Sequence, residues 1–190
     1  GLGELDRNPV EAMVWLQQAA YQGHAEAQYE LGKLFESGVL AGFDFNDALK
    51  WYEKAADQLW SAAFLRLGEI YSDKTRPIYH EQIGMNYFEL YRLALCQHAE
   101  QGDPEAQYQW AMLLMNGRHV ERDREKGLEW LRKAAEQEDP DALFTLAGLY
   151  LDGRGVPRDP ARAMDFLQQA AEQGHEKAQA RLEALRPQGE

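Results

Sequence analysis

Histidines and carboxylates are the residues of this sequence best suited to acid/base or metal chemistry. A metal site or a general base needs its partners at short, fixed spacings, but the histidines are scattered along the chain. The acidic segment at residues 136–141 has the character of a solvated helix end more than of a paired acid and base. These residue types therefore favour structural roles. The histidines are His24, His80, His98, His119 and His175.

Two further features could carry chemistry, a glycine-rich turn and a single thiol. The turn at residues 153–158, Gly-Arg-Gly-Val-Pro-Arg, could hold a phosphate through backbone amides, but its recurrence along the chain indicates a connector. Cys96 is the only cysteine, which excludes an intrachain disulfide and a multi-thiolate metal site, and we expect an inert, buried thiol. Nucleophile elbows, phosphate loops and metal-ligand clusters are missing from the sequence. We expect no catalytic centre, metal or cofactor.

The charge of the chain restricts its partners. It has 20 basic and 32 acidic residues and a formal charge of -12, which repels nucleic acid and anionic membrane surfaces. No segment approaches the roughly 20 apolar residues that span a bilayer, so we expect no direct membrane insertion. The start at Gly1 has no basic-then-apolar signal pattern, which leaves the bacterial periplasm and the cytoplasm both open for a soluble protein.

A repeat of 36 residues organises the sequence, and residues 140–175 are its most regular copy. Apolar residues at helical spacing lead into a glycine-rich turn and then into a second apolar segment that ends at Gly174. This pattern predicts helix, turn and helix. The alanine pair near the end of the copy recurs after 36, 79 and 36 residues, at Ala19–Ala20, Ala55–Ala56, Ala134–Ala135 and Ala170–Ala171.

These spacings divide the chain into one domain of repeats with ten helices. A partial repeat with a second helix only comes first, and four repeats and a closing helix follow. The opening inside a repeat suggests a piece of a longer protein, whereas the polar closing helix suits the end of a stack of repeats. The boundaries are 6–24 for the partial repeat, 25–60, 61–103, 104–139 and 140–175 for the repeats, and 176–190 for the closing helix and tail.

The second repeat is seven residues longer than the others. Its turn from Lys74 to Gly84 keeps the normal count, so the extra residues lie after Gly84. Seven residues are about two helical turns and rotate the apolar face by only ~20°. We expect a lengthened helix that keeps its phase, with an irregular loop as the alternative.

The repeat motifs resemble those of a known family. They are an A-x-A-x-x-x-L-G opening, a G-x-G-V-x-x-D turn, and an A-A-E-Q-G-H ending. The chain resembles the Sel1-like repeat family, relatives of the tetratricopeptide repeats. The resemblance implies an all-α, right-handed superhelix (a solenoid), a role in holding other proteins, no reaction, and a bacterial source. Repeat four carries the motif residues Ala142, Leu146, Ala147, Tyr150, Gly153, Gly155, Val156, Asp159, Ala163, Ala170, Ala171 and Gly174.

The same resemblance places a partner-binding groove on one face of the first helix of each repeat. We expect it to receive a protein or peptide with apolar anchors and basic flanks. The alternative is that the apolar row within it, one residue per repeat, only packs neighbouring repeats together. The expected groove residues are Tyr29, Lys33, Leu65, Glu69, Tyr108, Met112, Met115, Phe144 and Leu151.

The lengthened helix of repeat two suggests a second interaction surface. We expect its added turns to expose an apolar patch that docks a partner or forms a homodimer. The protein is thus expected to be a non-catalytic interaction scaffold or adaptor, with a structural oligomerisation segment of a larger assembly as the alternative. The residues expected in the patch are Tyr87, Phe88, Tyr91, Leu93 and Leu95.

Overall fold

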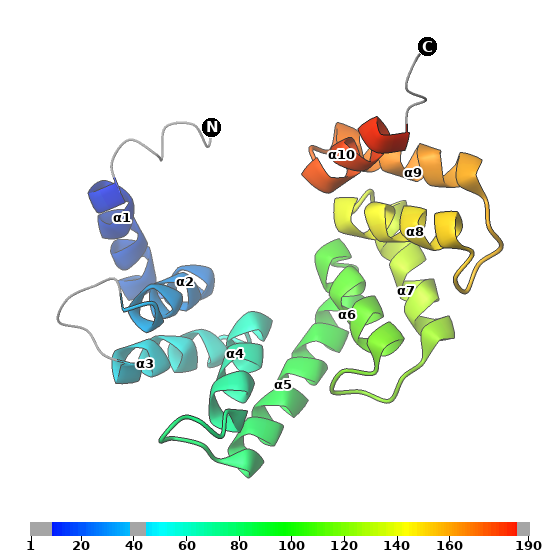
Figure 1. Cartoon of the computed structure of the whole chain (residues 1–190). Coiled ribbons are helices and arrows are strands. Elements are labelled where there is room, and N and C mark those ends of the chain that lie inside the picture. Colours follow the sequence, from blue (N-terminus) through cyan, green and yellow to red (C-terminus); the bar gives the residue numbers. More distant parts are fainter. Residues whose placement is uncertain (1–8, 39–44, 186–190) are drawn as a thin grey trace. The chain divides into compact units, whose positions relative to one another are not determined.

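A computed structural model describes residues 9–38 and 45–185, with side chains described from Met13 onwards, and within these ranges it contains ten helices and no strand (Figure 1). The chain divides into two compact units, the first ending at Ala94 and the second beginning at Leu95. The boundary falls inside α5, so each unit is described by itself. The helices are α1 (Pro9–Tyr21), α2 (Ala25–Glu36), α3 (Phe45–Ala56), α4 (Ser61–Ser72), α5 (Glu81–Glu100), α6 (Pro104–Asn116), α7 (Arg124–Glu136), α8 (Pro140–Asp152), α9 (Pro160–Glu172) and α10 (Glu176–Leu185).

Helices of the first unit pack closely because one position on the first helix of a pair has no side chain. A Cβ atom built on Gly32 of α2 would lie 2.7 Å from ring carbons of Tyr52, which is fully buried in α3. A Cβ atom on Gly68 of α4 would lie equally close to the ring of Phe88 in α5. Glycine therefore allows each aromatic ring to lie against the backbone of the neighbouring helix.

Four helices of the second unit begin with an aspartate that caps them. Each carboxylate accepts a hydrogen bond from the backbone N–H three residues later, at 2.8–3.0 Å. This contact satisfies one of the amides that a helix start leaves without a partner. Proline in the first turn of α6, α8 and α9 adds a backbone already set for a helix. The capping residues are Asp103, Asp123, Asp139 and Asp159.

The first helices of the second unit end in a repeated glycine and arginine arrangement. Gly153 ends α8 with a left-handed backbone, φ 68°, which glycine adopts without strain. Arg158 Nε then donates a hydrogen bond to the carbonyl oxygen of Leu151 at 3.0 Å. The same geometry occurs 36 residues earlier, at Met115, Gly117 and Arg122.

Repeat two has Lys74 where these helices have glycine, and its turn is built differently. Helix α4 ends at Ser72, and the backbone of the following residue, Asp73, is extended. The Asp73 carboxylate accepts hydrogen bonds from the Thr75 N–H at 2.9 Å and the Thr75 hydroxyl at 2.6 Å. These bonds, and weaker ones from Arg76, hold the pKa of Asp73 below its ordinary value. A side chain thus replaces the left-handed glycine.

Helix α5 is a single helix of 20 residues, whereas α3 has 12 and α7 and α9 have 13. The extra residues of repeat two therefore lengthen its second helix. This confirms the expected helix and excludes the irregular loop.

Two glutamine pairs hold repeats together at equivalent positions. Buried Gln28 donates through Nε2 to the Ala20 carbonyl at 3.1 Å and accepts from Gln58 Nε2 at 2.7 Å. Each pair satisfies a buried polar side chain within the fold. The second set lies 79 residues later and joins Gln107 to Ala99 at 3.1 Å and to Gln137 at 2.8 Å.

Candidate partner-binding surfaces

A hollow of about 610 Å3 in the first unit collects three of the expected groove residues. Tyr29 and Lys33 reach it from α2, and Glu69 reaches it from α4. The other lining residues are Glu36 of α2, Arg66 of α4, and Ser37 and Arg76 of the turns that follow these helices.

Glu36 is the electrostatic centre of this hollow. Its carboxylate accepts hydrogen bonds from Arg66 Nε at 2.8 Å, Arg66 Nη2 at 2.6 Å, Arg76 Nη2 at 3.0 Å and the Tyr52 hydroxyl at 2.8 Å. Burial alone would raise the pKa of Glu36, but the hydrogen bonds of Arg66 and Tyr52 and the two positive charges outweigh it and lower the pKa. Burial and the Glu36 carboxylate together raise the pKa of Tyr52. The Glu36 carboxylate is thus ionised, and both of its oxygens accept hydrogen bonds from within the fold.

Tyr29 has one side in the fold and one side toward the hollow. Its ring centroid lies 5.6 Å from that of Tyr52 in a tilted arrangement, and the Lys33 ammonium lies 5.5 Å from the Tyr29 ring. Half-burial raises the pKa of the Tyr29 hydroxyl. Leu65 of α4 is also half-buried but does not line this hollow.

A smaller hollow of about 270 Å3 in the second unit is lined by Phe144 and Leu151 of α8. The Phe144 ring stacks on the His175 ring with a centroid distance of 4.7 Å. His175 Nδ1 accepts a hydrogen bond from the Ala178 N–H at 3.0 Å, which starts α10. The expected structural role of this histidine is confirmed. Its copy at His24 forms no side-chain cap.

The three expected groove residues of α6 are all half-buried. Tyr108 and Met115 pack against the core of the second unit, and Met115 also lines another hollow described below. The row Tyr29, Leu65, Tyr108 and Phe144 is therefore half-buried throughout. Its members contribute to packing and keep part of their surface accessible.

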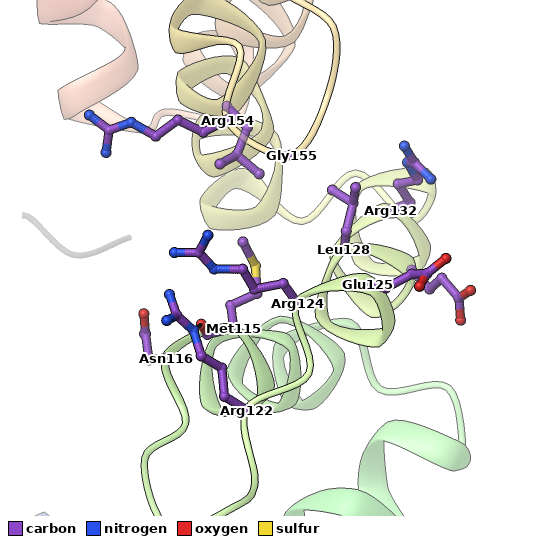
Figure 2. Close-up of a pocket in the computed structure, with 11 residues that line it drawn as sticks. Met115, Asn116, Arg122, Arg124, Glu125, Leu128, Arg132, Arg154 and Gly155 are labelled. Carbon is purple, nitrogen blue, oxygen red and sulfur yellow. Dashed lines mark hydrogen bonds between the residues drawn. The ribbon is translucent and has the colours of Figure 1, made fainter.

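A third hollow, of about 750 Å3, lies in the second unit and is lined by four arginines. Figure 2 shows the guanidinium groups of Arg122 and Arg124 near Asn116, whereas that of Arg154 extends to the same side but lies farther from Asn116, and Arg132 lies beyond Leu128. Met115, Leu128 and Leu149 supply its apolar surface, and Glu125 and Glu129 line it as well.

The sequence contains only a weak signal for this arginine hollow. Residues 118–132 hold four arginines and a lysine, which is unusual in an acidic chain. The same segment holds four carboxylates, so its net charge is close to zero. The fold brings Arg122, Arg124 and Arg132 together with Arg154 of another repeat, and Glu125 and Glu129 of the same segment line the hollow with them.

The part of the chain that the structure describes holds neither a cluster of metal-ligating side chains nor a membrane-spanning helix. Among residues 9–38 and 45–185, no three His, Cys, Asp or Glu side chains are grouped as a metal site needs. In the same ranges, no helix combines the length and the apolar character that crossing a membrane requires. Cys96 is half-buried, with its Sγ 3.7 Å from Glu100 Oε1.

The repeat motifs match the family model of the Sel1 repeat at residues 1–24, 25–58, 104–139 and 140–175, which together make up more than half of the chain. The chain belongs to the Sel1 repeat family. Sel1 repeats are non-catalytic protein-interaction modules. Residues 59–103, with all of α4 and α5, lie outside the four matched segments.

Solved structures and curated relatives agree with this assignment. The Sel1 repeat protein from Oxalobacter formigenes is 28% identical, with a TM-score of 0.60, and the match covers 90% of this chain and 67% of that one. The immunity protein PA5088 from Pseudomonas aeruginosa is 22% identical with a TM-score of 0.55, covers 86% of this chain and 56% of that one, and shows the fold alone. The all-α solenoid of Sel1-like repeats is confirmed.

A curated relative matches a shorter stretch. Chitin synthase regulatory factor 3 from Schizosaccharomyces pombe is 40% identical over 67 residues, which are 35% of this chain and 7% of that protein. The chain thus spans a small part of this relative. Because the relative is fungal, the expected bacterial source stays a prediction.

The patch expected on the lengthened helix of this Sel1 repeat chain is wrong in its composition. Tyr91 and Leu95 are buried, and Tyr87 and Phe88 are half-buried. Tyr87 stacks on Tyr71 with a centroid distance of 5.7 Å. Two added helical turns keep the apolar side facing the fold, because the insertion preserves the helical phase. Of the five residues only Leu93 is exposed, and the other exposed apolar residues of α5 are Met85 and Leu90.

Proposed function

We propose that this chain is a non-catalytic scaffold or adaptor that binds a partner protein on the exposed face of its first helices. The observation that supports this most is the hollow in which Tyr29, Lys33 and Glu69 meet. An aromatic side chain fixed on one side by the fold and open on the other is a preorganised anchor point, because little side-chain entropy is lost on binding. Phe144 and Leu151 offer a second such point in the other unit.

The partner segment carries apolar anchors and basic flanks. Each anchor contacts an aromatic or aliphatic residue of the row. The basic flanks face carboxylates that stand exposed in the first turn of three first helices, where Coulomb attraction adds to selectivity and association rate. These carboxylates are Glu26, Glu105 and Asp141. Glu36 is not among them, because two arginines already bind it.

The curated relative suggests what kind of adaptor this is. A protein named as a chitin synthase regulatory factor carries a segment 40% identical to part of this chain. We therefore propose a regulatory adaptor, in which the repeats position a target and supply no chemistry.

The test is quantitative capture of a partner from an extract of the source organism. We expect Tyr108→Ala/Phe144→Ala to lose the partner that the parent chain retains. Trp15→Ala is the matched control, since its side chain is 69% exposed on α1. Thermal unfolding followed by circular dichroism verifies that each variant is folded. A partner retained equally by a folded groove variant would contradict the proposal.

The alternative function, a structural oligomerisation segment, is favoured by the exposed Met85, Leu90 and Leu93 on α5. Apolar side chains gathered on one helix are a candidate contact between copies. Mass in solution decides between the two functions when the parent chain is compared with Leu90→Glu/Leu93→Glu. An oligomer that this variant dissociates, with no groove-dependent partner, supports the structural role. A monomer with groove-dependent capture supports the adaptor.

A further inference from the structure

We propose that the arginine-lined hollow of the second unit binds an acidic peptide segment in which carboxylates flank an apolar side chain. This inference rests on the proposed function as a protein-interaction scaffold, and it adds a second surface with the opposite charge preference. The two surfaces are tested with different variants, so one can fail without the other.

The arginines of the hollow have donors to spare. The Arg124 side chain forms no hydrogen bond or ion pair within the described part of the chain. Arg122 lines the hollow and donates its Nε to the Met115 carbonyl, while its two outer nitrogens form no hydrogen bond with the residues that the structure describes. Among the described residues, Arg154 pairs only with Asp152 of its own turn, at 3.2 Å, and its side chain is 77% exposed. A carboxylate that enters the hollow can therefore receive several charge-assisted hydrogen bonds.

Comparison of the repeats separates the arginines that the fold needs from those that it does not. Arg158, 36 residues after Arg122, makes the same bond to the end of the preceding helix, so Arg122 serves the turn. The position of Arg124 is Pro160 in the next repeat and Phe45 in the first. Both of those helices form without an arginine there. A structural requirement therefore does not explain Arg124.

The apolar side of the hollow is the reason why the proposed peptide carries an apolar side chain beside its carboxylates. Met115, Leu128 and Leu149 are half-buried and line the same hollow as the guanidinium groups. In Figure 2, Met115 lies next to Arg124, and Leu128 lies between that group and Arg132. An apolar side chain held there removes water from the neighbouring ion pairs and strengthens them. A free anion gains only the charge contacts.

The charge of the whole chain favours a short peptide over a polyanion. At a formal charge of -12, the protein repels nucleic acid over distances up to the Debye length, about 8 Å at physiological salt. A peptide with two or three carboxylates next to an apolar residue meets far less of this repulsion. It also covers both sides of the hollow.

The experiment is a selection from a random peptide display library on the purified chain. We expect the selected peptides to be enriched in Asp and Glu beside Leu, Ile, Met or Phe. Synthetic peptides of the enriched sequence are then measured by fluorescence anisotropy. Replacing their carboxylates by amides, or their apolar residue by Gly, is expected to weaken binding by about tenfold each.

Variants of the protein locate the site. Arg124→Ala is expected to weaken binding by about tenfold, and Arg124→Glu to abolish it, because a like charge meets the peptide carboxylates. Lys177→Ala is the matched control, since it removes one exposed positive charge from another helix of the same unit and is expected to bind as the parent does. Increasing NaCl is expected to weaken binding to the parent chain.

Four results would overturn the inference. The first is a selection without acidic enrichment, and the second is equal binding by the parent and a folded Arg124→Glu variant. The third is competition by inorganic sulfate with no need for the apolar residue, which would make the hollow an anion site only. Self-association lost in Arg124→Glu would replace the peptide with a second copy of this chain. Loss of peptide binding in Arg124→Glu, with the groove partner still captured, would separate this site from the groove.

Discussion

Arg66 of α4 donates two hydrogen bonds to the Glu36 carboxylate of α2, from Nε at 2.8 Å and from Nη2 at 2.6 Å. The two residues come from successive repeats and are 30 positions apart. This bidentate contact is the strong form of an ion pair, because its geometry matches the planar guanidinium to the carboxylate. The contact joins α2 to α4 and lies in the hollow that Tyr29, Lys33 and Glu69 also line.

Glu36→Gln is expected to reduce the free energy of unfolding by about 2 kcal/mol, since it leaves Arg66, Arg76 and Tyr52 without their shared acceptor charge. The Glu36 side chain is only 13% exposed. Urea denaturation measures the change. Glu30→Gln is the control, because its pair with Lys33 is exposed and is worth about 0.5 kcal/mol or less. Equal effects of the two substitutions would show that the Glu36 cluster is not stabilising.

The stability gap between the parent chain and Glu36→Gln is expected to depend on pH. Arg66, Tyr52 and Arg76 lower the folded pKa of Glu36 in spite of its burial, from the ordinary glutamate value of 4.5. The contribution is therefore complete above the unfolded pKa and is lost as the pH falls through the lower folded pKa. Urea midpoints from pH 7 down to pH 3 measure it. A gap that stays constant over this range would contradict the assigned shift.

Gly32→Ala is expected to destabilise the first unit by about 2 kcal/mol, because the new methyl group would lie 2.7 Å from the buried Tyr52 ring. Gly148→Ala in α8 is the matched control, since nothing lies within 4 Å of the added Cβ atom. Alanine there is expected to stabilise by about 0.5–1 kcal/mol through helix propensity. Thermal unfolding of both variants measures whether each substitution lowers or raises the stability of the parent chain. Stabilisation by both would show that α2 and α3 can move apart at no cost.

Gln107→Ala is expected to cost about 1–2 kcal/mol, because it removes a buried amide that links the Ala99 carbonyl to Gln137. Gln179→Ala removes the equivalent contact to Ala171, which is exposed, and is expected to change stability by about 0.5 kcal/mol or less. Chemical denaturation compares them. The glutamine link would be dispensable if the buried and exposed substitutions had the same effect.

The candidate sites were predictable only in part. The expected groove residues Tyr29, Lys33 and Glu69 share a hollow. The sequence did not indicate that Arg66 and Arg76 form ion pairs with Glu36 in that hollow. Those contacts span 30 and 40 positions, beyond the local patterns that a repeat reveals. The prediction of an exposed apolar patch on α5 is wrong for a related reason. Counting residues along a helix gives its phase but not the depth to which Tyr91 and Leu95 are buried.

By itself the sequence determined the repeat, its helices and their limits, because helical periodicity, capping aspartates and turn glycines act within a few residues of each other. The lengthening of α5 by the seven extra residues of repeat two followed from the same counting. Tertiary structure alone decided which charges are free. In the first unit, Glu36 forms ion pairs with Arg66 and Arg76. In the second unit, the Arg124 side chain has no ion pair among the described residues. Charge pairing between repeats depends on side-chain distances in space, and these arise only when the helices pack.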